Sequence, residues 1–109
     1  MAKRAAASGA PTYVRVAGMN LPVLVHDPNV DTYLDERFGY CDQGRKRIVL
    51  NSRNCREAMK ECLLHEIVHA ADDAAKVGLE EAQVCRLSRA LFAVVRDNPE
   101  LMEWLQRED

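Results

Sequence analysis

The most constraining feature of the sequence is a long stretch of helical periodicity near the centre of the chain. From about residue 55 to residue 76, apolar residues recur at intervals of three or four, which places them on one face of an α-helix. The members of this stripe are Met59, Leu63, Ile67, Ala70 and Ala74. We expect Ser52 or Asn54 to cap the start of the helix, and Gly78 stands where a helix would stop. The sequence therefore predicts a central helix whose apolar stripe faces the core.

Two further helices are predicted towards the C-terminus. Residues 80–96 again follow the helical period, and their apolar positions are Val84, Leu87, Leu91 and Val94 or Val95. Asn98 is expected to cap a short terminal helix that has Pro99 at its first position. We expect this last helix to pack against the protein through Leu101, Trp104 and Leu105.

The first half of the chain has the patterns of a small sheet. β-Branched residues fall into two runs within residues 12–25, separated by Ala-Gly-Met-Asn, and this arrangement predicts a hairpin. Residues 39–42 and 47–50 flank a polar turn and predict two more strands, while residues 31–37 suit a short helix or turn. Together with the helices, these strands indicate an α+β fold with a mostly antiparallel sheet.

The length of 109 residues suits a single domain. Residues 1–11 are small and polar and are expected to form a flexible arm, which leaves residues 12–109 for the domain. The formal net charge of -2 gives no reason to expect nucleic acid or a membrane as a partner. The four cysteines form no CxxC pair and no export segment precedes them, so we expect reduced thiols in the cytoplasm.

A second pattern lies inside the predicted central helix. Residues 65–69 read HEIVH, so two imidazoles lie four positions apart on one face, about 6 Å from each other. Both can then reach one tetrahedral Zn²⁺ ion through bonds of about 2.0 Å. Glu66 follows the first histidine, so its carboxylate lies beside the metal, where it can accept a proton from a bound water. We therefore expect His65 and His69 to be metal ligands and Glu66 to be a general base.

A catalytic zinc site usually has a third protein ligand. Glu81 lies beyond the Gly78 stop, in the first turn of the next helix, and a tight return would bring its carboxylate back to the histidines. The chain must recover about 10 Å of helix rise, which four or five extended residues at about 3.3 Å each can do. Glu80 is the nearest alternative, and periodicity only weakly favours Glu81 over it. Either glutamate could instead complement the start of the second helix.

Other residues near the motif allow different arrangements. Cys62 lies one turn before the first histidine and could, with Cys85, close a structural zinc site. Asp72 or Asp73 could accept a hydrogen bond from the second nitrogen of the His69 ring. An oxyanion donor is not identifiable, although Tyr33, Tyr40 or His26 could approach from the sheet.

In residues 63–70 (LLHEIVHA) and 78–81 (GLEE), the chain resembles small HExxH metallopeptidases. These are the ImmA/IrrE and SprT-like, gluzincin-type groups, whose short members occur in bacteria and phages. The resemblance implies a zincin-like minimal domain, with a small sheet packed on the HExxH helix, a second long helix and a short C-terminal helix.

The same resemblance implies a zinc-dependent metallo-endopeptidase that acts on a protein or peptide substrate. His65 and His69 match the histidine ligands of the family, Glu66 matches its catalytic base, and Glu81 best matches its glutamate ligand. The interval before this last glutamate is shorter than in many relatives.

Two other functions remain open from the sequence. The same ligands could hold zinc in an interaction or structural protein that cuts no peptide. Alternatively, a metal-free adaptor could use residues 84–104 as a partner surface.

Overall fold

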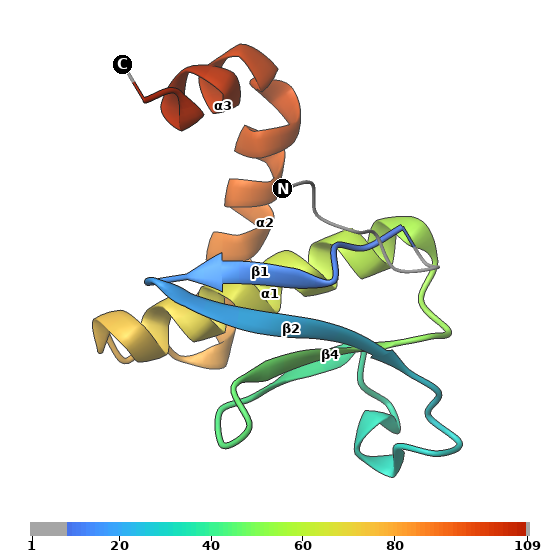
Figure 1. Ribbon diagram of the computed structural model, residues 1–109. Coiled ribbons are helices and arrows are strands. Elements are labelled where there is room, and N and C mark those ends of the chain that lie inside the picture. The colour runs from blue at the N-terminus through green and yellow to red at the C-terminus, as the bar shows by residue number, and fades with distance from the viewer. Residues whose placement is uncertain (1–8, 109) are drawn as a thin grey trace.

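The structure, a computed structural model, describes residues 9–108 (Figure 1). The strands are β1 (Tyr13–Val16), β2 (Met19–His26), β3 (Gly39–Asp42) and β4 (Arg47–Asn51). The helices are η1 (Thr32–Leu34), a 3₁₀ turn, and α1 (Arg56–Ala75), α2 (Glu81–Asp97) and α3 (Pro99–Gln106). The α+β class expected from the sequence is confirmed.

The four strands form one mixed sheet in the order β1-β2-β4-β3. The β1–β2 and β3–β4 pairs are antiparallel, as expected, whereas β2 and β4 run parallel, with Val23 opposite Ile48. The predicted four-residue separator of the first hairpin is shorter in the structure, because Met19 and Asn20 already belong to β2. Ala17 and Gly18 alone make the turn, both with positive φ, as the tightest hairpin turns require.

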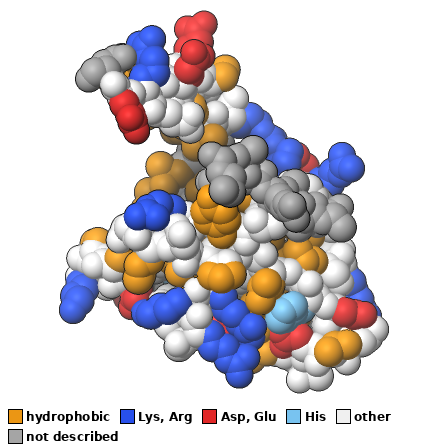
Figure 2. Space-filling view, in the orientation of Figure 1, with side chains coloured by type: hydrophobic (Ala, Val, Ile, Leu, Met, Phe, Trp, Pro, Cys, Tyr) orange, Lys and Arg blue, Asp and Glu red, His pale blue; other side chains and the backbone are white. Residues whose placement is uncertain are grey.

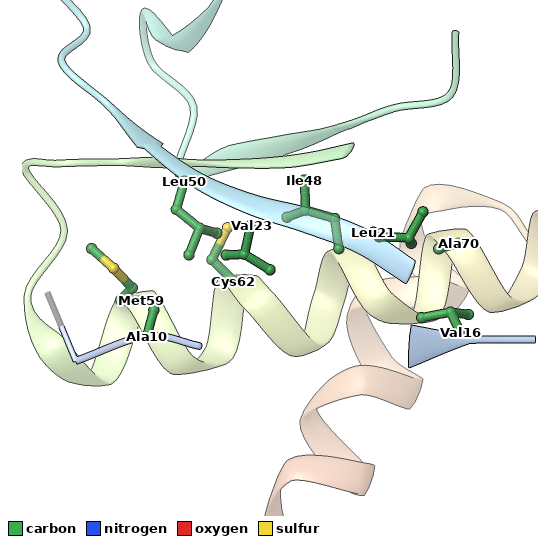
Figure 3. Packing of buried hydrophobic residues seen from close by; sticks show 9 residues of the cluster. All are labelled: Ala10, Val16, Leu21, Val23, Ile48, Leu50, Met59, Cys62 and Ala70. Carbon is green, nitrogen blue, oxygen red and sulfur yellow. The ribbon is translucent and has the colours of Figure 1, made fainter. Parts of the chain in front are cut away.

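The core lies between the sheet and α1 (Figure 3). Side chains from β2 and β4 face side chains of α1, and the cluster comprises Ala10, Val16, Leu21, Val23, Ile48, Leu50, Met59, Cys62 and Ala70. Ala10 falls within the segment that the sequence assigned to the arm, but the structure buries it in this cluster. The rest of that arm up to residue 8 lies outside the described residues. The sheet thereby anchors α1 along its length.

The predicted central helix is confirmed, but its predicted caps are wrong. Cys55 precedes the first turn in an extended conformation and makes no capping hydrogen bond with its side chain. Asn54 donates instead to the carbonyl oxygen of Phe38, at 2.8 Å, and the Ser52 amide donates to the carbonyl oxygen of His26. Both residues therefore tie the start of α1 to distant loops rather than capping it.

The apolar stripe of α1 faces the core only in part. Met59 and Ala70 are buried, and Leu63 and Ile67 pack partly buried against the cluster. Ala74 is exposed, contrary to the prediction, because the last turn of α1 extends past the buried cluster. Glu66 is buried although its side chain is ionisable.

The C-terminal helix is present but does not pack as expected. Leu101, Trp104 and Leu105 are 38%, 58% and 60% exposed. The side chain of Asn98 does not cap α3 and donates instead to the carbonyl oxygen of Val94, at 2.9 Å. Figure 1 shows why: the second half of α2 leaves the body of the molecule and holds α3 at its far end, where the sheet and α1 do not reach. Among the described residues, no helix has the length and apolar character needed to cross a bilayer.

Candidate metal centre

The two histidines of the HExxH motif lie on adjacent turns of α1. Their ring centroids are 4.8 Å apart and their planes differ by 72°. Both side chains are mostly shielded, with exposed fractions of 19% for His65 and 28% for His69. Because α1 is fixed by the sheet, this helix presents the two rings as a rigid pair.

Glu81, the first residue of α2, completes the group. Its Oε1 atom lies 2.8 Å from Nε2 of His65, and its Oε2 atom lies 2.8 Å from Nε2 of His69. One possible ligand atom from each of the three residues lies within 4.8 Å of the other two. The carboxylate thus returns to the histidines as the sequence spacing suggested, and the three residues could hold a metal ion.

The return depends on the tight connection between α1 and α2. Lys76 ends α1 in the left-handed conformation, and Gly78 also has a positive φ of 83°. Asp72 accepts hydrogen bonds from the amides of Gly78, at 2.9 Å, and Leu79, at 3.1 Å. The sequence offered Asp72 as a partner of His69, but the structure uses its carboxylate to fix this connection.

Glu80 and Cys62 do not join the metal group. Glu80 precedes α2 and forms a reciprocal capping box with Gln83, whose side chain accepts from the Glu80 amide at 2.8 Å. Cys62 is 7% exposed in the apolar core, where burial raises the pKa of its thiol to about 12. Cys62 is also not one of the three residues whose possible ligand atoms lie close together.

The alternative cysteine-rich site is therefore not formed. Cys85 lies closer to the group, with Sγ 3.7 Å from Oε1 of Glu81, but it is not one of the three clustered residues. All four cysteines are free in the structure.

Glu66 lies beside the metal group but is not part of it. Only 6% of the residue is exposed, and burial, aided by the nearby negative charge of Glu81, raises the pKa of its carboxyl to about 7. Arg37 opposes this shift because its positive charge favours the ionised carboxylate. The Glu66 carboxyl therefore changes its protonation state near neutral pH.

A groove of about 800 Å³ runs past the metal group, between the loop before β3 and the start of α2. Its walls include Tyr33, which the sequence offered, and four residues that the sequence did not single out: Arg37, Phe38, Arg89 and Phe92. Phe38 is 67% exposed, and the Arg37 guanidinium stacks on the Tyr33 ring at 4.4 Å. The signal that could have found them is weak, because two aromatic residues beside an arginine also suit an ordinary surface loop.

Two of the three residues proposed to approach from the sheet, His26 and Tyr40, bind the carboxylate of Asp31, and Tyr33 and Tyr40 also line the groove. Asp31 accepts from the Tyr40 hydroxyl at 2.6 Å and pairs with Nδ1 of His26 at 2.8 Å. The hydrogen bond from Tyr40, followed by that from His26, lowers the pKa of Asp31, while burial and the same carboxylate raise the pKa of Tyr40 to about 12. The Tyr40 hydroxyl is thus already engaged with Asp31.

Comparison of the chain with protein-family models, with characterised proteins and with solved structures finds no match. The resemblance to the ImmA/IrrE and SprT-like groups therefore rests on the residues of the motif themselves. Two imidazole nitrogens and one carboxylate oxygen form a donor set that suits Zn²⁺, with one coordination position left for water or substrate.

Proposed function

We propose that the protein is a zinc-dependent metallo-endopeptidase of zincin-like fold, related to the ImmA/IrrE or SprT-like groups. One observation carries the proposal: Nε2 of both motif histidines lies 2.8 Å from the Glu81 carboxylate, directly beside a buried glutamate. A purely structural metal site would need neither the buried Glu66 nor an adjoining groove.

The roles of the residues follow from their positions. His65, His69 and Glu81 would hold the ion. When bound, Zn²⁺ supplies Lewis-acid polarisation of the scissile carbonyl group and lowers the pKa of a water. Glu66 accepts the proton of the attacking water on its carboxylate and later donates it to the leaving amine.

The groove favours an extended polypeptide as substrate. The exposed Phe38 ring and the Phe92 ring lie on its walls. Apolar rings can bind apolar substrate side chains, while Arg37 and Arg89 can bind acidic groups or carbonyl oxygens.

Metal content tests the ligand set. We expect about one equivalent of zinc in the purified protein after loading, measured by elemental analysis. Glu81→Gln should lower the zinc affinity strongly, because it removes the anionic ligand. Glu80→Gln is the matched control, since the neighbouring residue caps α2 and should leave the affinity unchanged. Equal zinc binding by both variants would exclude Glu81 as a ligand.

Proteolysis tests the function itself. Zinc-loaded wild-type protein is incubated with a peptide library, and mass spectrometry identifies new termini. Glu66→Gln should keep its zinc and lose cleavage by a factor of about 10² or more, because the base is missing. A loaded wild type that cuts no more than Glu66→Gln would support the alternative, a zinc-stabilised interaction protein without catalysis.

A further inference from the structure

The projecting end of the molecule exposes an unusual amount of apolar surface. We call it the C-terminal apolar surface, and it consists of Leu87, Leu91, Val94, Val95, Leu101, Trp104 and Leu105. Each of these side chains is between 38% and 60% exposed. Figure 2 shows hydrophobic side chains where this end joins the body of the molecule. The surface is independent of the metal group.

On α2, Leu87, Leu91 and Val94 lie on a different side from the groove, whereas Val95 follows Phe92 by three residues and continues the line of the groove residues. The groove is lined by Glu81, Cys85, Ser88 and Phe92, which follow one another at helical spacing. Leu87, Leu91 and Val94 follow a parallel line at intervals of four and three, rotated away from it. A partner on this line would therefore leave the groove open.

The extent of the surface calls for a partner. Seven large apolar side chains at these exposures amount to several hundred Å² on one molecule, near the upper end for a monomer and close to the roughly 800 Å² that each side of a stable interface buries. The eight residues of α3 are also too few for a stable isolated helix, and α3 packs chiefly on α2. Burial of the surface would supply the missing packing.

The charges around the surface indicate what the partner is. Between its two terminal acidic residues, α2 carries only arginines, Arg86, Arg89 and Arg96, of which the last pairs with Glu57 at 2.7 Å. The charged residues of α3 are Glu100 and Glu103. One helix of the projecting end is therefore basic and the other is acidic.

Two of these charges have matching sequence offsets from the centre of the surface. Arg86 lies eight residues before Val94, and Glu103 lies eight residues after Val95. Asn98 interrupts the helix between them, and Arg89 belongs to the groove. In a two-fold pairing each contact occurs twice, so the basic part of one copy would meet the acidic part of the other.

We propose that a second copy of this chain binds the C-terminal apolar surface. The two copies pack in antiparallel orientation about a two-fold axis near Val94 and Val95, with α2 of each against α3 of the other. Leu87, Leu91 and Leu101 form the apolar centre, and Arg86 pairs with Glu103 across the interface. In this dimer, the second copy covers the side of α2 that bears Leu87 and Leu91. Glu81 is the first residue of this helix.

Sedimentation velocity over a wide range of protein concentration tests the proposal. The wild type should shift from a species of 12.3 kDa to one of twice that mass. Leu91→Glu should remain monomeric, because it buries a charge at the centre of the interface. Val30→Glu is the matched control, since Val30 is 85% exposed and lies outside the surface. Circular dichroism shows whether each variant is folded.

Charge exchange gives a second test that leaves the apolar residues untouched. Arg86→Glu and Glu103→Arg should each weaken association by roughly fivefold or more, because symmetry places the lost pair in the interface twice. The double variant R86E/E103R should regain most of the wild-type affinity. A wild type that stays monomeric, or a double variant as weak as the single ones, would overturn the proposal. A monomer that co-sediments with phosphatidylcholine vesicles would also overturn it, by assigning the surface to lipid.

Discussion

At the scale of single residues, the site depends on side chains that have unusual surroundings. Glu66 is buried beside two histidines, and Asp31 receives hydrogen bonds from Tyr40 and His26 at one carboxylate. The first arrangement raises the pKa of the carboxyl that acts as the base in the proposed reaction. The second has no role in the proposed reaction, and it fixes the loop before β3 to the strand.

The Asp31 network gives a prediction about stability in acid. The pKa of Asp31 is lowered in the folded protein, so its contribution is present above the ordinary value of 3.8 and is lost as the pH falls through the lowered value. Tyr40→Phe removes the principal cause of this shift. We expect a smaller free energy of unfolding at pH 7 and a shallower loss of stability below pH 3.8, measured by urea denaturation.

Tyr33→Phe is the control for this measurement. Tyr33 contacts the Tyr40 ring edge-on, at 4.7 Å between centroids, and it is 57% exposed. Tyr33→Phe should therefore lose stability in acid in the same way as the wild type. If Tyr40→Phe and Tyr33→Phe behaved alike, the hydroxyl of Tyr40 would not be what lowers the pKa of Asp31.

At the scale of elements, the decisive feature is the connection from α1 to α2. Asp72 holds the amides of Gly78 and Leu79, and α2 then begins directly at Glu81. The Asp72 carboxylate therefore sets the position of Glu81, the proposed third ligand, although Asp72 is not itself one of the three clustered residues.

Asp72→Ala should consequently weaken zinc binding without removing a ligand. We expect a loss of about 10- to 100-fold in affinity, the range found when residues that orient metal ligands are replaced, measured by competition with a chromophoric chelator. Asp73→Ala is the matched control, because this exposed neighbour does not hold the connection. Similar losses in both variants would indicate a general effect of charge near the site.

The elements also show what could be predicted from the sequence. The periodicity of α1 and the spacing from His69 to Glu81 are local, so the helix and the return of the Glu81 carboxylate to the histidines were both predictable. The caps were not: Asn54 has the right chemistry for a cap, but it binds the carbonyl of Phe38, a partner sixteen residues away. Trp104 was expected to be buried because its helix is amphipathic, yet periodicity identifies an apolar face without naming what covers it. The groove residues Arg37 and Phe92 meet only through tertiary packing.

At the scale of the whole molecule, the metal group lies between two parts that are packed into the core to different extents. The sheet and α1 share the core, whereas α2 contributes only Val84 and Ser88 as buried residues. A metal held by His65, His69 and Glu81 would therefore fasten the less supported helix to the core.

Zinc should accordingly stabilise the folded protein. A ligand that binds only the folded state adds about 2.7 kcal/mol when its free concentration is 100 times its dissociation constant. We expect Zn²⁺ to raise the midpoint of thermal unfolding of the wild type, measured by calorimetry, and to have little effect on Glu81→Gln. An equal rise in both proteins would mean that the ion binds elsewhere.

All four residues of the proposed chemistry lie within positions 65–81, on two consecutive helices and the short turn that joins them. Closing so short a loop costs little conformational entropy compared with bringing together the ends of the chain. Grafting this helical hairpin onto another scaffold would thus transfer the complete constellation in one contiguous fragment, without rebuilding the strands.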